Sequence, residues 1–137
     1  MPITFGSLFS GAGGMDIGLE RAGMECRWQC EIDPQASSVL ARHWPGVTRF
    51  EDIRTVRKKD LAPVDVVVGG FPCQDLSVAG NRKGLSGERS GLFYELVRVV
   101  RLCKPRFVVW ENVGGLLSSD DGRDFGRIIR ALADIGY

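Results

Sequence analysis

A cysteine and a glutamate each directly follow an apolar run that suits a buried strand. Cys73 lies in the run GFPCQ at residues 70–74, just after the β-branched stretch 64–68, and Glu111 comes immediately after residues 107–110. Because the carboxyl ends of parallel strands meet at one edge of an open sheet, the two side chains are expected in one cleft. A thiol just past a strand, on a turn stiffened by proline, favours a nucleophile over a packing residue. Glu111 could instead be a helix cap or a turn residue.

The segment after Cys73 bears on whether its thiol can react. A free thiol is mostly protonated at neutral pH, so a nucleophilic role needs cationic or hydrogen-bonding neighbours. Arg82, Lys83 and Arg89 bring positive charge to residues 74–91, a Gly-, Ser- and Asn-rich segment that is long for a loop in a compact domain. The same side chains could contact phosphates or could be ordinary solvated charges, and the sequence leaves these alternatives open.

A glycine-rich turn, SGAGG at residues 10–14, follows the first apolar run and precedes a helical pattern. A doubly wound sheet holds nucleotide-like ligands at such a turn, because glycine allows close backbone approach beside a helix N-terminus. The dinucleotide fingerprint would need glycine where this chain has Asp16, which disfavours a pyrophosphate ligand. Glu31 lies 20 residues beyond Gly11, at the end of the second predicted strand, where a carboxylate can accept from both ribose hydroxyls. This combination suits an adenosyl group without a diphosphate.

Asp52 and Ile53 follow a third, shorter predicted strand. A carboxylate in this position could accept a hydrogen bond from an exocyclic amine while Ile53 packs against the ring that carries it. An aspartate in a charged surface loop is the alternative, and the pattern alone supports the two equally.

The elements that must position these residues alternate between apolar runs and segments of helical periodicity, which is typical of an α/β fold with a doubly wound, mostly parallel sheet. Asp33 suits a helix cap and Pro34 the first helical turn. Residues 51–63 are expected to form a charged surface connection. Strands are expected at residues 3–9, 27–30, 47–50, 64–68 and 107–110, and helices at 15–22, 34–43, 92–102 and 125–135.

Composition limits the classes of protein to consider. The length of 137 residues is that of a single domain. The 18 Lys and Arg against 17 Asp and Glu give a formal charge of +1, which does not indicate a protein that binds polyanions. Without a leader pattern or a stretch long enough to cross a bilayer, a soluble cytoplasmic protein is expected. Cys26, Cys30 and Cys103 lack paired spacing and His43 is the only histidine, so we expect reduced core thiols and no metal site.

These motifs occur together, and in this order, in one enzyme family. The chain resembles the DNA (cytosine-5)-methyltransferases over essentially its whole length, which implies a Rossmann-like S-adenosylmethionine-dependent methyltransferase fold. The resemblance implies cofactor contacts for Phe9, Ser10, Gly11, Ala12, Gly13, Gly14, Glu31, Ile32, Asp52, Ile53, Pro72 and Leu92. It implies catalysis by Cys73 and Glu111, and contacts with the target base or DNA for Phe71, Pro72, Gln74, Ser77, Lys83, Arg89, Asn112 and Val113.

The resemblance also implies a mechanism. The binding partner is double-stranded DNA, and a cytosine is flipped out of the duplex into the pocket. The Cys73 thiolate adds to C6 while Glu111 hydrogen-bonds N3 and the exocyclic amine. C5 then takes the methyl group of S-adenosyl-L-methionine, and 5-methylcytosine and S-adenosyl-L-homocysteine are released without a metal. A bacterial or phage restriction–modification setting is implied by the family.

Family members continue past the point that corresponds to Tyr137, into further strands, an arginine-bearing motif, a target-recognition region and a C-terminal helix. Residues 1–137 are therefore expected to be the N-terminal, cofactor-binding and catalytic part of the domain. The strand at 107–110 should present an unpaired apolar edge that self-associates or meets a complementary C-terminal chain. Two other interpretations remain open: a tRNA cytosine-5 methyltransferase, and a catalytically silent fragment that binds cofactor or a partner.

Overall fold

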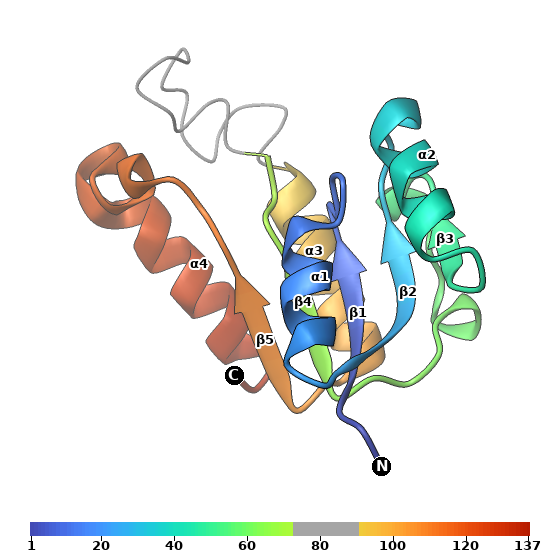
Figure 1. Ribbon diagram of the computed structural model, residues 1–137. Helices are drawn as coiled ribbons and strands as arrows, with labels where there is room; N and C mark the ends of the chain where they lie inside the picture. The colour runs from blue at the N-terminus through green and yellow to red at the C-terminus, as the bar shows by residue number, and fades with distance from the viewer. Residues whose placement is uncertain (73–90) are drawn as a thin grey trace.

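Five parallel strands form one sheet in the computed structural model, which describes residues 1–72 and 91–137. Their order is β3-β2-β1-β4-β5, so the chain starts at the centre and winds outward in both directions (Figure 1). This confirms the predicted α/β, doubly wound fold. The strands are β1 (Thr4–Leu8), β2 (Glu25–Cys30), β3 (Thr48–Phe50), β4 (Val66–Gly69) and β5 (Phe107–Trp110).

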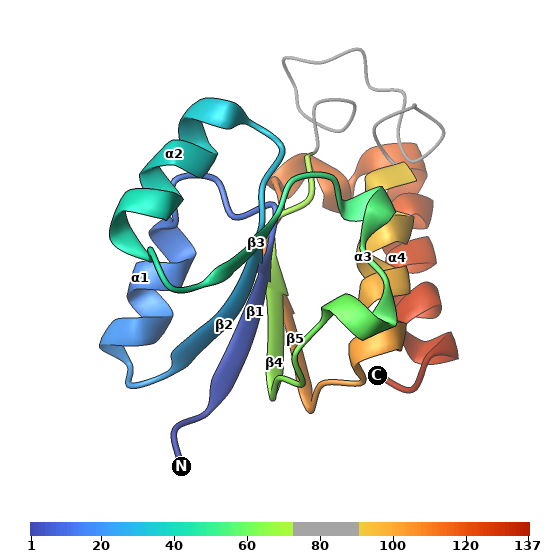
Figure 2. The ribbon, with the colours of Figure 1, turned by 90° about the vertical axis from the view of Figure 1, so that its right-hand side faces the viewer.

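In the described ranges, four α-helices cover both faces of the sheet. One face carries α1 (Gly14–Arg21) and α2 (Pro34–His43), and the other carries α3 (Gly91–Cys103) and α4 (Arg123–Asp134), as Figure 2 shows. Asp33 caps α2 as predicted, because its carboxylate accepts a hydrogen bond from the Ala36 N–H at 2.8 Å. All the predicted helices are present, and their ends lie within two residues of the prediction.

The core has two layers, one on each side of the sheet. The β-branched run of β4 contributes to both, since Val67 lies in the layer beneath α3 and α4 while Val66 and Val68 lie in the layer beneath α1 and α2. All three side chains are buried, as the sequence predicts for a central parallel strand. The sheet is therefore held from both faces, and its carboxyl edge is left to carry the loops.

The connection after β3 differs from its prediction. It contains two short 3₁₀ turns, η1 (Ile53–Thr55) and η2 (Lys58–Asp60). Ile53 and Val56 are buried and belong to the same core layer as α3, so the first half is an anchored part of the fold rather than a surface connection. Two apolar side chains three residues apart among charges can both point inward in a 3₁₀ turn, which explains the difference.

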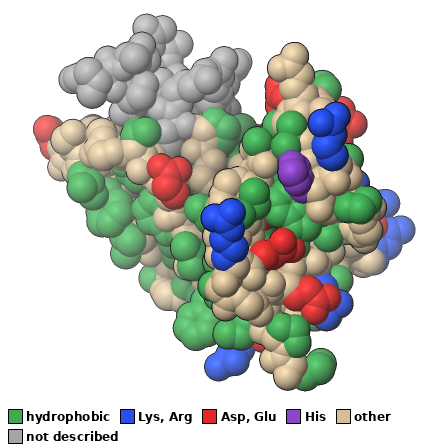
Figure 3. Space-filling model, in the orientation of Figure 1, with side chains coloured by type: hydrophobic (Ala, Val, Ile, Leu, Met, Phe, Trp, Pro, Cys, Tyr) green, Lys and Arg blue, Asp and Glu red, His purple; other side chains and the backbone are tan. Residues whose placement is uncertain are grey.

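Strand β5 lies at one edge of the sheet, and among the described residues it pairs with β4 alone. Phe107 and Val109 both lie on the face of the sheet that carries α1, and they are about half exposed, at 55% and 48%. Hydrophobic side chains gather over this side of the molecule in Figure 3. The predicted unpaired apolar edge is therefore present in the part of the chain that the structure describes.

Membrane-spanning helices and clusters of metal-binding side chains are both absent from the described residues. Within residues 1–72 and 91–137, no helix is long and apolar enough to cross a membrane. In the same ranges, no three His, Cys, Asp or Glu side chains are grouped so that they could hold a metal ion.

A carboxylate is buried beneath α1. Asp16 accepts hydrogen bonds from the Ser7 hydroxyl at 2.7 Å and from the Gln29 side-chain amide at 2.8 Å. Burial raises the pKa of the Asp16 carboxyl above its usual value, against the opposing effect of the two donors. The Gln29 Oε1 atom is buried and has no hydrogen-bond partner among the described residues.

Replacing Asp16 with alanine should lower the free energy of unfolding by about 2–4 kcal/mol, because two buried donors lose their acceptor. Asparagine should cost less than about 1 kcal/mol, since Gln29 can turn its amide so that Oε1 accepts from the new side chain. Urea unfolding of both variants measures the difference. An asparagine variant as unstable as the alanine variant would contradict the proposed rearrangement.

The pH dependence of the asparagine variant gives a second check. Because the folded-state pKa of Asp16 is raised above 3.8, the wild-type protein loses stability as the pH rises from below 3.8 through that pKa. The asparagine variant lacks this loss. Its stability relative to the wild type should therefore increase with pH across that window.

Candidate cofactor pocket and catalytic edge

A cavity of about 650 Å³ opens at the carboxyl edge of the sheet, where the loops after β1, β2, β3 and β4 meet. Its size is within the usual range for small-molecule sites, roughly 300–1,000 Å³. Polar carboxylates and apolar side chains share its wall. The lining residues are Phe9, Cys30, Glu31, Ile32, Glu51, Asp52, Ile53, Arg54, Gly70, Pro72 and Leu92.

Seven of the twelve predicted cofactor residues line this cavity: Phe9, Glu31, Ile32, Asp52, Ile53, Pro72 and Leu92. The other five, residues 10–14, form the turn after β1 and the first residue of α1. Gly11 and Gly13 adopt positive φ angles of 57° and 86°, which explains why glycine occupies these positions. A side chain at Gly13 would also collide with Trp44, whose ring lies 2.5 Å from the position of an added Cβ.

The Glu31 carboxylate is held by the backbone of two loops. Its Oε2 accepts from the Gly11 N–H at 2.7 Å, and its Oε1 accepts from the Asp33 N–H at 2.9 Å. Each oxygen keeps a further lone pair for a ligand hydroxyl. The carboxylate is thereby fixed in orientation beside the glycine turn, which is the arrangement that recognition of a ribose diol needs.

The Asp52 carboxylate is paired with Arg54. Oδ1 accepts from the Arg54 N–H at 3.0 Å, and Oδ2 accepts from the guanidinium at 2.9 Å. These hydrogen bonds with Arg54 lower the pKa of Asp52 below its usual value, so the group is an anionic acceptor at neutral pH. An acceptor next to the apolar Ile53 suits an aromatic ring that carries an amino group.

Cys30 also lines the cavity, and its thiol is not suited to nucleophilic attack. Burial, followed by the nearby carboxylates of Glu31 and Asp52, raises the pKa of Cys30 to about 12. The thiolate is the reactive form of cysteine, and it is scarce at neutral pH for such a group. The prediction that Cys30 is a core residue holds, because only 3% of it is exposed.

Glu111 lies against the end of β4. Its N–H donates to the Gly69 carbonyl at 3.2 Å, and a Cβ added to Gly70 would lie 2.9 Å from Glu111 Oε2. Gly70 is part of the cavity wall and directly precedes the turn that leads to Cys73. The Glu111 carboxylate therefore lies beside this cavity, on the edge of the sheet where the sequence predicts it.

Gly70→Ala should disturb this carboxylate specifically. The added methyl group would push Glu111 Oε2 away, since 2.9 Å is closer than a Cβ normally approaches an oxygen. The resemblance implies catalysis by Glu111, so the methyl transfer it implies should fall by about tenfold or more, the usual effect of misplacing a catalytic group, with little change in affinity for the implied cofactor. Methylation and binding assays on the same preparation check this. An equal fall in both properties would place the main role of Gly70 in the cofactor wall.

The remaining predicted site residues divide into two groups. Asn112 follows Glu111 and its Oδ1 accepts from the Val113 N–H at 2.7 Å, while its buried Nδ2 has no hydrogen-bond partner among the described residues. Val113 is partly exposed. Cys73, Gln74, Ser77, Lys83 and Arg89 lie outside the described residues.

Phe71, a predicted contact with the target base or DNA, has its side chain in the core. Its side chain is 3% exposed and packs against the rings of Phe93 and Trp110, with centroid separations of 5.2 and 6.1 Å. The side chain belongs to the core because Phe71 comes two residues after the end of the central strand β4 and packs against Phe93 of α3. A contact between Phe71 and a substrate would therefore have to come from its backbone.

Four cavity residues were not among the predicted cofactor contacts: Cys30, Glu51, Arg54 and Gly70. Cys30 and Glu51 directly precede Glu31 and Asp52, and Arg54 follows Ile53, so position at a strand end was a signal that could have identified them. The sequence indicates Gly70 only as part of the GFPCQ run, and its closeness to Glu111 depends on the pairing of β4 with β5.

The chain is similar in sequence to known methyltransferases. The chain is 38% identical over 135 residues to the type II methyltransferase M2.BsuMI of Bacillus subtilis and 39% identical over 137 residues to M.Bsp6I of a Bacillus species, covering 96% and 98% of this chain. It spans 34% and 44% of the length of these two relatives.

A solved structure shows the same fold. It is a prophage-encoded E. coli protein described as a candidate DNA modification methyltransferase, with a TM-score of 0.77 and 27% identity over 96% of this chain and 38% of its own. The sequence profile of the C-5 cytosine-specific DNA methylases matches residues 3–137. This match covers nearly the whole chain, which therefore belongs to the C-5 cytosine-specific DNA methylase family.

Proposed function

We propose that this chain supplies the cofactor-binding and nucleophile-bearing part of an S-adenosylmethionine-dependent DNA (cytosine-5)-methyltransferase. The observation that carries the proposal is the placement of Glu111 next to Gly70. Gly70 lines a cavity that the Glu31 and Asp52 carboxylates also line. Groups for holding an adenosyl cofactor and a group for holding a base thus share one edge of the sheet.

The cavity fits the adenosyl part of the cofactor in its pattern of acceptors. Glu31, oriented by the N–H groups of Gly11 and Asp33, would accept from the ribose hydroxyls. Asp52 would accept from the exocyclic amine of adenine, and Ile53 would pack against the ring. The bound cofactor supplies an electrophilic methyl group.

Glu111 and Cys73 would act on the cytosine. The Cys73 thiolate forms a bond to C6, and the electron pair of the C5–C6 double bond becomes available at C5. Glu111 stabilises this electron-rich ring by hydrogen bonds to N3 and the exocyclic amine. After methylation at C5, loss of the C5 proton restores the double bond and expels the thiolate, so the cysteine is regenerated.

The substrate proposed is a cytosine in double-stranded DNA, reached by base flipping. Gln74, Ser77, Lys83, Arg89, Asn112 and Val113 are the proposed contacts with the DNA or the target base. Their sequence context supports this, since Lys83 and Arg89 can neutralise phosphates. The type II methyltransferase names of the two relatives support a restriction–modification setting.

Calorimetric titration of the chain with S-adenosyl-L-homocysteine, followed by a methylation assay, tests the proposal. Saturable binding, and 5-methylcytosine in duplex DNA after incubation with S-adenosyl-L-methionine, are the expected results. Binding without methylation would show a cofactor-binding fragment that needs further segments. Methylation of tRNA and not of DNA would reassign the substrate. A folded chain that does not bind the cofactor product would contradict the assigned pocket.

We also propose that the β5 edge associates with further β structure, from a complementary chain or a second copy. Val109→Lys places a charge on the exposed edge, which should suppress self-association because a buried charge opposes edge-to-edge pairing. Sedimentation velocity at increasing protein concentration measures the effect, with exposed Val39→Lys on α2 as the control. A wild-type chain that stays monomeric would exclude the second copy as the partner.

A further inference from the structure

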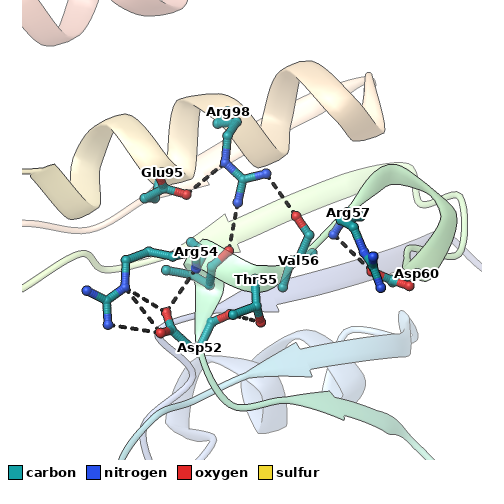
Figure 4. A network of polar contacts seen from close by, with 9 residues as sticks. Asp52, Arg54, Thr55, Val56, Arg57, Asp60, Glu95 and Arg98 are labelled. Carbon is teal, nitrogen blue, oxygen red and sulfur yellow. Dashed lines mark hydrogen bonds and ion pairs between the residues drawn. The ribbon is translucent and has the colours of Figure 1, made fainter.

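Arg98 lies in α3 and joins this helix to the turn after β3. Its Nη1 donates to the Val56 carbonyl at 2.8 Å and its Nη2 donates to the Ile53 carbonyl at 2.7 Å. Its Nε donates to the Glu95 carboxylate, also at 2.7 Å. Figure 4 shows the guanidinium spanning the space between α3 and this turn. All three nitrogens of the side chain are therefore engaged in one fixed arrangement.

The turn held in this way carries one wall of the cavity. Asp52, Ile53 and Arg54 all line it, and Asp52 caps the N-terminus of η1. Side chains anchor the turn from below, since Ile53 and Val56 are buried in the core. Arg98 binds the carbonyls of the same two residues. The position and the orientation of the turn relative to the core and to α3 are therefore both fixed.

Helix α3, which carries Arg98, also contributes to the cavity wall. Leu92, Glu95 and Arg98 are spaced three residues apart on α3, and residues at this spacing are neighbours on a helix surface. Leu92 lines the cavity, while Glu95 orients the Arg98 guanidinium. This row of side chains thus links the α3 wall of the cavity to the Asp52 wall.

We propose that Arg98 is a positioning residue for cofactor recognition, which sets the Asp52–Ile53 wall against helix α3. This inference rests on the proposed function, because it takes that wall to face the adenine ring. Arg98 itself does not line the cavity, so it acts through Asp52. Loss of Arg98 should affect discrimination at the exocyclic amine of adenine more than folding.

The geometry requires arginine rather than any cation. The planar guanidinium reaches two carbonyls three residues apart and a carboxylate at the same time, whereas a lysine ammonium is a compact charge on a flexible stem. Arg98→Lys therefore keeps the charge but loses the two-carbonyl contact. Exposed Arg101, on the same helix but at the opposite end of the sheet from the cavity, offers the matched control Arg101→Lys.

The first measurement needs no ligand. Hydrogen exchange of the Thr55 and Val56 amides, which donate within the turn to Asp52 and Ile53, reports how firmly the turn is held. Exchange in residues 52–56 should be faster in Arg98→Lys than in the wild type and unchanged in Arg101→Lys. Equal exchange in all three proteins would overturn the role of Arg98.

The second measurement compares two ligands, S-adenosyl-L-homocysteine and its deaminated analogue S-inosyl-L-homocysteine, which has a carbonyl in place of the amine. The wild type should prefer the adenosyl ligand by about tenfold or more, the effect of one hydrogen bond to a charged acceptor. Arg98→Lys should bind the adenosyl ligand more weakly and lose most of this preference, while Arg101→Lys should retain it. A purely structural role would weaken both ligands equally and leave the ratio unchanged.

The outcomes separate this inference from the proposed function. A wild-type chain that binds neither ligand would count against the cofactor pocket, while the exchange measurement would still decide whether Arg98 holds the turn. Binding with an unchanged preference in a folded Arg98→Lys chain would overturn the positioning role and leave the pocket assignment intact.

Discussion

Replacing Cys73 with alanine should abolish methyl transfer and leave the affinity for S-adenosyl-L-homocysteine nearly unchanged. A methyl group at C5 requires prior addition at C6, and alanine has no nucleophile to add. We expect a fall in rate on the order of 10⁴ or more, as in other enzymes that lose a covalent nucleophile. Radiolabelled methyl transfer to duplex DNA and calorimetry on the same preparation measure the two effects. The assay uses the chain alone or with a complementary segment that restores activity.

The other thiols of the chain provide the controls for this prediction. Burial raises the pKa of Cys103 to about 11, and burial followed by nearby carboxylates raises those of Cys26 and Cys30 to about 12. These groups carry little thiolate at neutral pH. A covalent adduct with DNA that contains 5-fluorocytosine should therefore form in Cys103→Ala and not in Cys73→Ala. Retained turnover in Cys73→Ala would remove its assigned role.

Replacing Glu31 with alanine should weaken binding of S-adenosyl-L-homocysteine by about 100-fold or more, because two ribose hydroxyls lose a charged acceptor. The substitution has a second effect in this chain. Glu31 also ties Gly11 to Asp33 through its two oxygens, so the glycine turn loses its attachment to the loop after β2. Calorimetric titration measures the affinity, and circular dichroism verifies that the variant is folded.

Glu51→Ala is the matched control for this prediction. Glu51 is a carboxylate that lines the same cavity but is exposed and directly precedes Asp52. A nonspecific loss of negative charge at the cavity would affect both variants alike. Equal losses of affinity in Glu31→Ala and Glu51→Ala would contradict a specific role of Glu31 in binding the ribose.

The strands and most helices of this fold could be predicted because their signals are local. Val66, Val67 and Val68 form a continuous apolar run, and Asp33 followed by Pro34 is a helix start that depends on nearby residues alone. The η1 turn could not be predicted in this way. Its structure depends on Ile53 entering the core and on contacts with α3, more than 40 residues away in sequence.

The same distinction applies to the candidate site. Residues at strand ends, such as Glu31 and Asp52, could be proposed from their place after an apolar run. The fit of Gly70 against Glu111 and the contact of Arg98 with two carbonyls depend on pairing and packing between distant segments. No spacing in the sequence reports such contacts. The burial of the Phe71 side chain is a similar case, because it follows from packing against Phe93 and Trp110.

The central position of β1 has a kinetic consequence. Phe5 of β1 pairs with Val66 of β4, and Thr4 bonds to Asp65 across 61 residues of chain, so the middle of the sheet joins segments far apart in sequence. Such contacts must close a long loop before they stabilise anything, which slows folding. As the chain leaves the ribosome, β1 can pair with β2 early but must wait for β4 with its other edge exposed. The rate of folding of this domain during synthesis should therefore be limited by the time at which β4 becomes available to pair with β1. Chaperones would act mainly before that pairing, while the edge of β1 is exposed.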